Sequence, residues 1–214
     1  MTLIASVLHL DRQALKALKI TDPYSLHRVV YSLYPDIRSD MDKKQSVSSG
    51  ILWADQGGDR LGRTILMLAN RQPAEKVDEK YGEVRSKPIP EGFLDHSHYQ
   101  FKVIVNPTRR DNTSRKLIAV RGREAIASWF AERAETSWGF LVDAAQLQVG
   151  AVEVLNFGDK QGRTITIGQA HVEGSLLISD SQQFRHSFSK GIGRGRAYGC
   201  GLLQIVPIID SPFS

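Results

Sequence analysis

The amino-acid sequence predicts an α+β protein in which helices cover antiparallel sheets. The first observation is that one order, strand, helix, strand, strand, helix, strand, fits residues 1–90 and again residues 91–214. The second is the segment Pro-Ile-Pro-Glu-Gly at residues 88–92, which has the composition of a linker. Because this order defines the ferredoxin-like or RRM-like (βαββαβ) fold, the sequence predicts two tandem ferredoxin-like domains.

The elements of the first domain follow from local patterns. A mostly apolar run predicts a buried strand at residues 2–10. Asp22 can cap a helix whose first position is Pro23 and whose end lies before Pro35. A glycine-containing turn at residues 57–62 joins two strand-like runs. The predicted elements are strands at residues 2–10, 47–54, 64–69 and 83–89, and helices at residues 23–34 and 74–81.

The second domain repeats the order. A basic loop follows its first strand, and the turn at residues 158–162 separates two long strand-like runs. A glycine-rich stretch at residues 191–201 lies between its last helix and its last strand. The predicted elements are strands at residues 99–105, 147–157, 164–178 and 202–209, and helices at residues 123–134 and 181–190.

The composition is that of a folded protein that can bind an anionic partner. The chain has 214 residues, of which 41% are hydrophobic, so it can form the cores of two small domains. The formal net charge of +5 is unevenly distributed, since residues 102–123 contain seven basic side chains and one acidic one. Residues 181–209 contain four lysines and arginines and no carboxylate side chain. We therefore expect two docking segments for a polyanion.

The sequence contains one cysteine, Cys200, and no long apolar segment. A single cysteine excludes an intrachain disulfide and a cysteine-cluster metal site. No run approaches the roughly 18 to 20 apolar residues of a membrane span, and the N-terminus lacks the pattern of a secretion signal. We expect a soluble, cytoplasmic protein that uses no metal or cofactor and does not associate with a membrane.

His27 is the first candidate for chemistry. Four residues of the predicted helix share one face beside its apolar stripe, and these are Tyr24, His27, Arg28 and Tyr31. Histidine titrates near physiological pH and can transfer protons. Taken alone, the spacing favours an ordinary surface histidine, and a catalytic role stays an open alternative.

Cationic residues in three segments are candidate contacts for nucleic-acid phosphates. They lie in the basic loop at residues 106–116, at the turn at residues 158–162 and in the glycine-rich stretch, whose exposed amides allow close approach of a phosphate backbone. The candidates are Arg109, Arg110, Arg115, Lys116, Lys160, Arg163, Arg194 and Arg196. The alternatives are a solvated loop, an ordinary charged turn and a helix C-cap at Gly191. The glycine spacing fits neither a P-loop nor a dinucleotide fingerprint.

Short motifs follow one another along nearly the whole chain. They are Tyr-Ser-Leu-His-Arg at residues 24–28, Tyr-Pro at 34–35, a segment at 101–110 ending in Asn-Pro-Thr-Arg-Arg, Trp-Phe at 129–130, Gly-Phe at 139–140, Gly-Ser-Leu-Leu at 174–177, Gly-Ile-Gly at 191–193 and Tyr-Gly-Cys-Gly-Leu-Leu at 198–203. Together they resemble the CRISPR-associated CasE family, the repeat-cleaving endoribonuclease subunit of Cascade-type complexes within the RAMP superfamily. The basic loop is shorter here than in some relatives.

The resemblance implies roles for the candidate residues. His27 occupies the position of the family's catalytic histidine and Tyr24 that of an assisting tyrosine. Arg28 and the cationic candidates would bind RNA, with the catalytic helix in the first domain and the RNA-binding loops in the second. The implied partners are the precursor crRNA stem-loop, the mature crRNA and other subunits of a Cascade-like effector complex.

The implied reaction is metal-independent, because RNA supplies its own nucleophile, the 2′-hydroxyl beside the scissile phosphate. We expect cleavage at the base of the repeat stem-loop, giving 2′,3′-cyclic phosphate and 5′-hydroxyl ends. One alternative is a non-catalytic RAMP-type subunit that retains crRNA in an effector complex, and it predicts that His27→Ala leaves repeat processing unchanged. A second is a single-strand reader of the RRM type, which the absence of the aromatic-rich RNP1 pattern disfavours.

Overall fold

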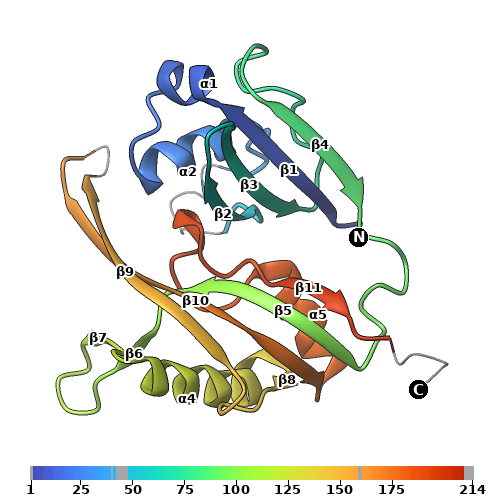
Figure 1. The fold of residues 1–214 in the computed structure, drawn as a ribbon, viewed down its shortest axis with the longest axis vertical. Coiled ribbons are helices and arrows are strands. Elements are labelled where there is room, and N and C mark those ends of the chain that lie inside the picture. Colours follow the sequence, from blue (N-terminus) through green and yellow to red (C-terminus); the bar gives the residue numbers. More distant parts are fainter. Residues whose placement is uncertain (1, 40, 42–47, 159–160, 210–214) are drawn as a thin grey trace. The chain divides into compact units, whose positions relative to one another are not determined.

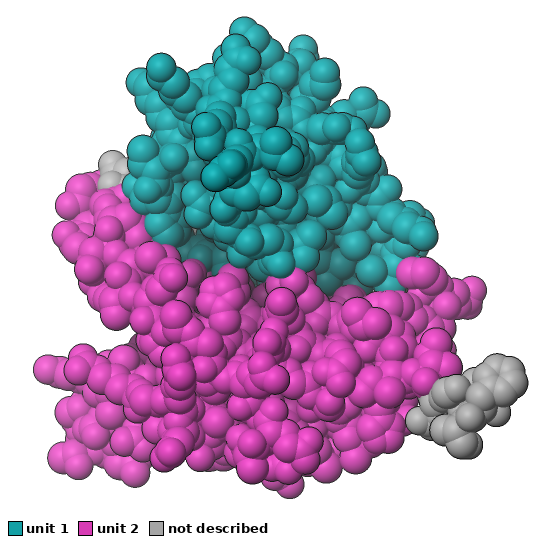
Figure 2. All heavy atoms as spheres, in the orientation of Figure 1, with its two compact units in different colours: residues 1–89, 197–199 teal, residues 90–196, 200–214 magenta. Residues whose placement is uncertain are grey.

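The computed structural model describes residues 2–39, 41, 48–158 and 161–209 of the 214-residue chain. The chain forms two compact units, which Figure 2 shows in different colours. The first unit comprises residues 1–89 together with residues 197–199, and the second comprises residues 90–196 and 200–214. The segment 197–199 therefore packs with the N-terminal unit, although it lies near the other end of the sequence.

Four antiparallel strands form the sheet of the first unit in the order β2-β3-β1-β4 (Figure 1). The strands are β1 (Ile4–Asp11), β2 (Leu52–Gly58), β3 (Gly62–Ala69) and β4 (Glu83–Pro88). Two helices, α1 (Arg12–Ala17) and α2 (Pro23–Ser32), follow β1. This strand order, with β1 and β3 at the centre, is that of a ferredoxin-like sheet.

Helix α2 begins at the predicted residue because its cap is made locally. The Asp22 carboxylate accepts a hydrogen bond of 2.7 Å from the Ser25 backbone N–H. In return the Ser25 hydroxyl oxygen accepts one of 3.0 Å from the Asp22 N–H, which completes a capping box. The buried face of α2 is the predicted apolar stripe of Leu26, Val29 and Val30, which Leu33 continues at the C-cap, and it shares one core cluster with Leu8 and Leu10 of β1. The face that carries His27 lies beside this core stripe, and Tyr31 on that face packs partly against the same core.

The predicted helix at residues 74–81 is wrong. Val77 and Tyr81 instead exchange two backbone hydrogen bonds of 2.8 Å across a tight turn, in which Asp78 and Glu79 have positive φ. The Val77 side chain is buried in the core. An isolated helix of eight residues is only marginally stable, so these tertiary contacts override the helix propensity of the segment. Helix α1, which has only six residues, was not predicted.

The turn between β2 and β3 is shorter than predicted. The predicted strand at 47–54 is observed at Leu52–Gly58, so two of the turn glycines belong to β2; residue 47 lies outside the described residues. Gly62 begins β3, and a Cβ added there would lie 2.1 Å from the Leu10 carbonyl oxygen. Only glycine permits this close approach of β3 to β1.

The sheet of the second unit has the order β11-β5-β10-β8, and β9 also pairs with β10. Its strands are β5 (His98–Val105), β8 (Phe140–Leu141), β9 (Gln148–Gly158), β10 (Thr164–Ile178) and β11 (Gln204–Pro207). Its helices are α4 (Arg123–Arg133), which a π-helical turn (Ala134–Trp138) continues, and α5 (Ser181–Lys190). A short 3-10 turn (Arg196–Tyr198) follows within the glycine-rich stretch. The β11-β5-β10 order is again ferredoxin-like, which confirms the predicted fold class.

The predicted basic loop is partly a hairpin. Strands β6 (Thr108–Arg110) and β7 (Leu117–Ala119) pair antiparallel, and they lie beside α4 in Figure 1.

The core of the second unit is aromatic, with the ring of Phe101 on β5 stacked at 5.4 Å on that of Phe130 on α4. Among the described residues, no helix is long and apolar enough to cross a membrane.

Candidate active site and arginine pocket

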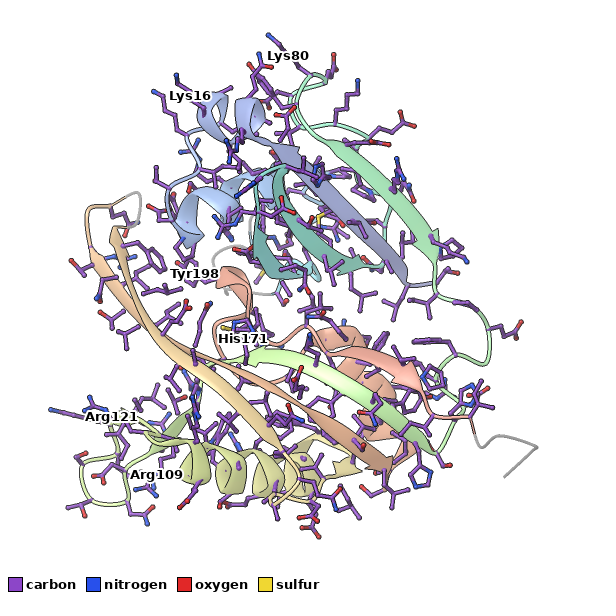
Figure 3. The ribbon with its side chains drawn as sticks, in the orientation of Figure 1. Lys16, Lys80, Arg109, Arg121, His171 and Tyr198 are labelled. Carbon is purple, nitrogen blue, oxygen red and sulfur yellow. The ribbon has the colours of Figure 1, made fainter. Side chains whose placement is uncertain are left out.

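His27 is half-buried on α2 and surrounded by three tyrosine rings. The ring centroid of Tyr31 lies 4.0 Å from that of His27, and the centroid of Tyr24 lies 6.2 Å away in a nearly parallel stack. Both tyrosines are on α2, as the helical spacing predicts. The third ring, at 5.9 Å, is that of Tyr198 from the segment 197–199, which is labelled in Figure 3.

The same segment sets the protonation of the His27 ring. Nδ1 of His27 lies 2.9 Å from the carbonyl oxygen of Ala197. Because a carbonyl oxygen can only accept, Nδ1 must carry the proton and donate, which leaves the lone pair of the neutral ring on Nε2. His27 can therefore accept a proton at Nε2 while Nδ1 stays engaged.

The electrostatic surroundings favour the neutral ring. Burial lowers the pKa of His27 from 6.5, the hydrogen bond to Ala197 opposes this by raising it, and the nearby charge of Arg38 lowers it further. The net effect is a lowered pKa, because desolvation penalises the imidazolium more than the hydrogen bond favours it. At neutral pH the ring is thus mainly in the form that can act as a base.

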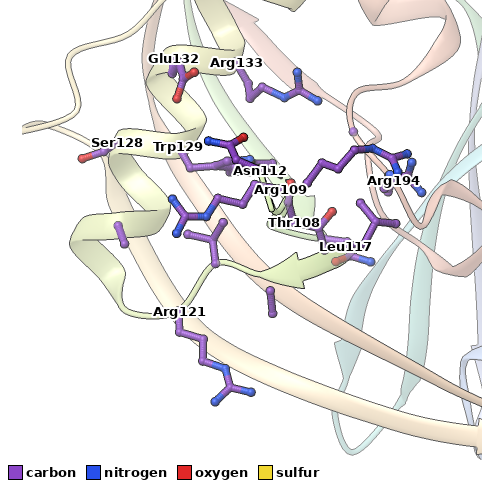
Figure 4. Close-up of a pocket in the computed structure, with 16 residues that line it drawn as sticks. Thr108, Arg109, Asn112, Leu117, Arg121, Ser128, Trp129, Glu132, Arg133 and Arg194 are labelled. Carbon is purple, nitrogen blue, oxygen red and sulfur yellow. Dashed lines mark hydrogen bonds between the residues drawn. The ribbon is translucent and has the colours of Figure 1, made fainter. Parts of the chain in front are cut away.

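A separate feature of the second unit gathers positive charge. A pocket of about 710 Å³ is formed by the β6–β7 hairpin, the turn before α4, one side of α4 and the glycine-rich stretch (Figure 4). Five exposed arginines line it, namely Arg109, Arg110, Arg121, Arg133 and Arg194. Within the described ranges none of the five is in an ion pair, and Glu132 is the single carboxylate among the lining residues. The pocket therefore offers a high density of donors to phosphate oxygens.

Backbone and side-chain hydrogen bonds hold the walls of this pocket together. The indole Nε1 of Trp129 on α4 donates to the carbonyl oxygen of Thr108 on β6 at 3.2 Å. A backbone bridge between Asn106 and Arg194 joins the end of β5 to the glycine-rich stretch. The arginines thus project from three chain segments whose backbones are fixed to one another.

Comparison with known proteins identifies the family. A family model described as CRISPR associated protein matches residues 4–207. The chain belongs to this family. Cse3 of Thermus thermophilus, a CRISPR-associated endoribonuclease, is 22% identical over 199 residues, which cover 88% of this chain and 92% of Cse3.

Solved structures of CRISPR proteins show the same fold. A structure of the CRISPR endoribonuclease Cse3 bound to 19-nucleotide RNA matches with a TM-score of 0.79 and 20% identity, covering 97% of this chain and 100% of the other. A chain of a CRISPR RNA-guided surveillance complex matches with a TM-score of 0.68 and 23% identity, also covering 97% and 100%. The resemblance to CasE proteins that the sequence motifs indicated is confirmed.

Only some of the cationic residues predicted to bind RNA line the arginine pocket. Arg109, Arg110 and Arg194 line the pocket, whereas the other described candidates do not, and these are Arg28, Arg115, Lys116, Arg163 and Arg196. The Arg196 Nη1 donates to the carbonyl oxygen of Lys190 at 2.8 Å, and the Arg115 carbonyl oxygen accepts from Arg110 at 2.9 Å. Arg28 is exposed on α2. Lys160 lies outside the described residues.

Sequence reasoning missed several residues of both sites. Arg121 belongs to the basic run at residues 102–123, so its place in the sequence could have identified it as a phosphate contact. Arg133, at the end of α4, lies outside any basic run and could not have been found in this way. Figure 3 labels Arg109 and Arg121 at the hairpin end of the second unit. Tyr31 shares the helical face of His27, whereas Ala197 and Tyr198 are 170 or more residues away from it in sequence. Only the glycine-rich composition of residues 191–201 indicated a functional segment there.

Proposed function

We propose that this CRISPR associated protein is a repeat-specific endoribonuclease that cleaves precursor crRNA at the base of the repeat stem-loop. The observation that carries the proposal is the His27 site, in which Nδ1 is bound by a carbonyl, Nε2 holds a lone pair and the pKa is lowered. The relationship to Cse3, an endoribonuclease whose structure has been solved with RNA, supports the same substrate class.

The reaction follows from the chemistry of RNA. His27 Nε2 takes the proton of the 2′-hydroxyl, whose oxygen attacks the adjacent phosphorus. The bond from phosphorus to the 5′-oxygen then breaks, and this oxygen takes up a proton from the imidazolium or from water. The products are a 2′,3′-cyclic phosphate and a 5′-hydroxyl, and the nucleophile needs no metal to form. A well-placed base contributes roughly 10²- to 10⁴-fold to such a step. Tyr24 orients the phosphate or shares the proton transfer, and Arg28 offsets charge that develops on it.

The arginine pocket binds the phosphate backbone of the stem. Arg109, Arg110 and Arg194 form these contacts together with Arg121 and Arg133, because guanidinium groups bind phosphate oxygens in bidentate fashion. Arg115, Lys116, Lys160, Arg163 and Arg196 stay predicted contacts outside this pocket. The mature crRNA remains a ligand, and the other partners are subunits of a Cascade-like complex, consistent with the similarity to a chain of a surveillance complex.

Cleavage of a repeat RNA that carries a single 2′-deoxy nucleotide at the scissile position tests the mechanism. We expect the substitution to abolish cutting and to leave RNA affinity unchanged, and we expect full activity in EDTA. Activity that disappears in EDTA and returns with added magnesium would contradict the scheme. If the wild-type protein and His27→Ala both bind the repeat RNA and neither processes it above background, the chain is the non-catalytic RNA-binding subunit instead.

A further inference from the structure

The Ala197 carbonyl that binds His27 is itself fixed by a second donor. The indole Nε1 of Trp53 donates to the same oxygen at 3.2 Å. A carbonyl oxygen has two lone pairs, so it can accept from both the indole and the imidazole. Trp53 lies on β2 with only 1% of its surface exposed, which makes it a rigid support for this oxygen.

The glycine after Tyr198 allows this arrangement. Gly199 has a φ of +83°, and a Cβ added there would lie 3.0 to 3.3 Å from three carbon atoms of the Trp53 ring. The backbone of the segment 197–199 therefore lies directly on the indole, in a conformation that side-chain-bearing residues rarely adopt. The contact places the Ala197 carbonyl between Trp53 and His27.

The imidazole also packs against the ring of Tyr31. The Tyr31 ring, 4.0 Å from His27 between centroids, has its hydroxyl oxygen engaged by the Ser49 hydroxyl, which donates at 3.0 Å. The Ser49 carbonyl oxygen in turn accepts from the Arg71 guanidinium at 3.0 Å. Tyr31 thus limits rotation of the His27 ring, whereas the hydrogen bond that selects the tautomer, among the described residues, is the one to Ala197.

From these contacts we propose that Trp53 is a positioning residue, which aims the Ala197 carbonyl at His27 Nδ1 and thereby reserves Nε2 for the RNA. The glycine-rich stretch is then part of the catalytic apparatus as well as a phosphate-binding loop. Trp53 does not touch RNA in this scheme and acts only through Ala197. The inference deepens the proposed nuclease function and rests on it for its consequence in catalysis.

NMR spectroscopy of protein labelled with ¹⁵N-histidine tests the proposal directly, because long-range ¹H–¹⁵N couplings show which ring nitrogen carries the proton. At a pH where His27 is neutral, we expect the wild-type ring to be protonated on Nδ1. Trp53→Phe, which removes the indole N–H and keeps an aromatic ring, should shift His27 toward protonation on Nε2. Gly199→Ala should shift it in the same direction, because it displaces the carbonyl while leaving Trp53 in place.

Single-turnover cleavage then measures the consequence. Misplacement of a catalytic group by about 1 Å can cost about 100-fold, so we expect Trp53→Phe to slow cleavage by between about 10- and 100-fold at unchanged RNA affinity. Trp138→Phe, the same exchange in the core of the second unit, is the control and should leave both the tautomer and the rate as in the wild type.

Two outcomes would overturn the proposal. One is a wild-type His27 protonated on Nε2, and the other is a Trp53→Phe variant whose tautomer and cleavage rate equal those of the wild type. The spectra do not depend on activity, so they decide the positioning role even if the wild-type protein fails to cut repeat RNA. That failure would refute the proposed function alone.

Discussion

Single alanine substitutions in the arginine pocket should each remove one phosphate contact. Each contact with duplex RNA releases about 0.9 of a counterion, taking the value for B-form DNA, so the slope of log affinity against log salt concentration should become less negative by about 0.9 per arginine. Between 50 and 200 mM salt, one such contact weakens binding by about 3.5-fold, and five contacts together weaken it by about 500-fold. The wild-type protein should therefore show a slope of about −4.5 or steeper.

Fluorescence anisotropy with a labelled repeat hairpin, titrated at several salt concentrations, measures these slopes. The decisive variants are Arg133→Ala and Arg194→Ala, since one arginine was found only in the structure and the other was also predicted from the sequence. Arg85→Ala is a suitable control, because Arg85 is exposed on β4 of the first unit and paired with Glu83 at 2.9 Å. If neither pocket variant changes the slope more than the control does, the pocket does not bind the RNA backbone.

Three further predictions concern helix α2, which carries the proposed base. Asp22→Ala should destabilise the first unit by about 1 kcal/mol and also slow cleavage, because the cap that starts α2 is lost. Asp180→Ala removes the cap of α5 and should lower stability without a comparable loss of rate. Thermal melts and single-turnover assays measure the two effects, and an Asp180→Ala variant that cuts as slowly as Asp22→Ala would contradict the prediction. Because burial lowers the pKa of His27, the acid limb of the kcat/KM profile should lie below pH 6.5, where the protonated ring can no longer accept a proton, and a limb above that pH argues against His27 as the base. Tyr24→Phe should lower the rate less than His27→Ala does, and a Tyr24→Phe variant as slow as His27→Ala would make the hydroxyl an essential group.

The parts of the fold that the sequence could predict are those fixed by neighbouring residues. Asp22 and Pro23 define the start of α2, and the apolar stripe defines its buried face, so both were predicted correctly. Residues 74–81 consist largely of good helix formers, yet the burial of Val77 and its pairing with Tyr81 determine their conformation. Local propensity anticipates neither the burial of Val77 in the core nor the turn that this burial favours.

The same distinction applies to the candidate site. His27 and its neighbours Tyr24 and Tyr31 follow from the period of one helix, so their proximity could be predicted. The carbonyl of Ala197 carries no sequence signal at all, because every residue has one and only the folded chain brings this one to Nδ1. The tautomer of the His27 ring, on which its proposed use as a base depends, was therefore beyond sequence analysis.

The contribution of residues 197–199 to the first unit limits the modularity of this protein. A fragment cut at the interdomain linker would keep the histidine and its tryptophan support but would lack the backbone oxygen that both donate to. Residues 1–89 therefore cannot be exchanged between homologues independently of residues 197–199. A chimaera keeps the hydrogen bond from His27 to residue 197 only if the homologue that provides the N-terminal half also provides residues 197–199.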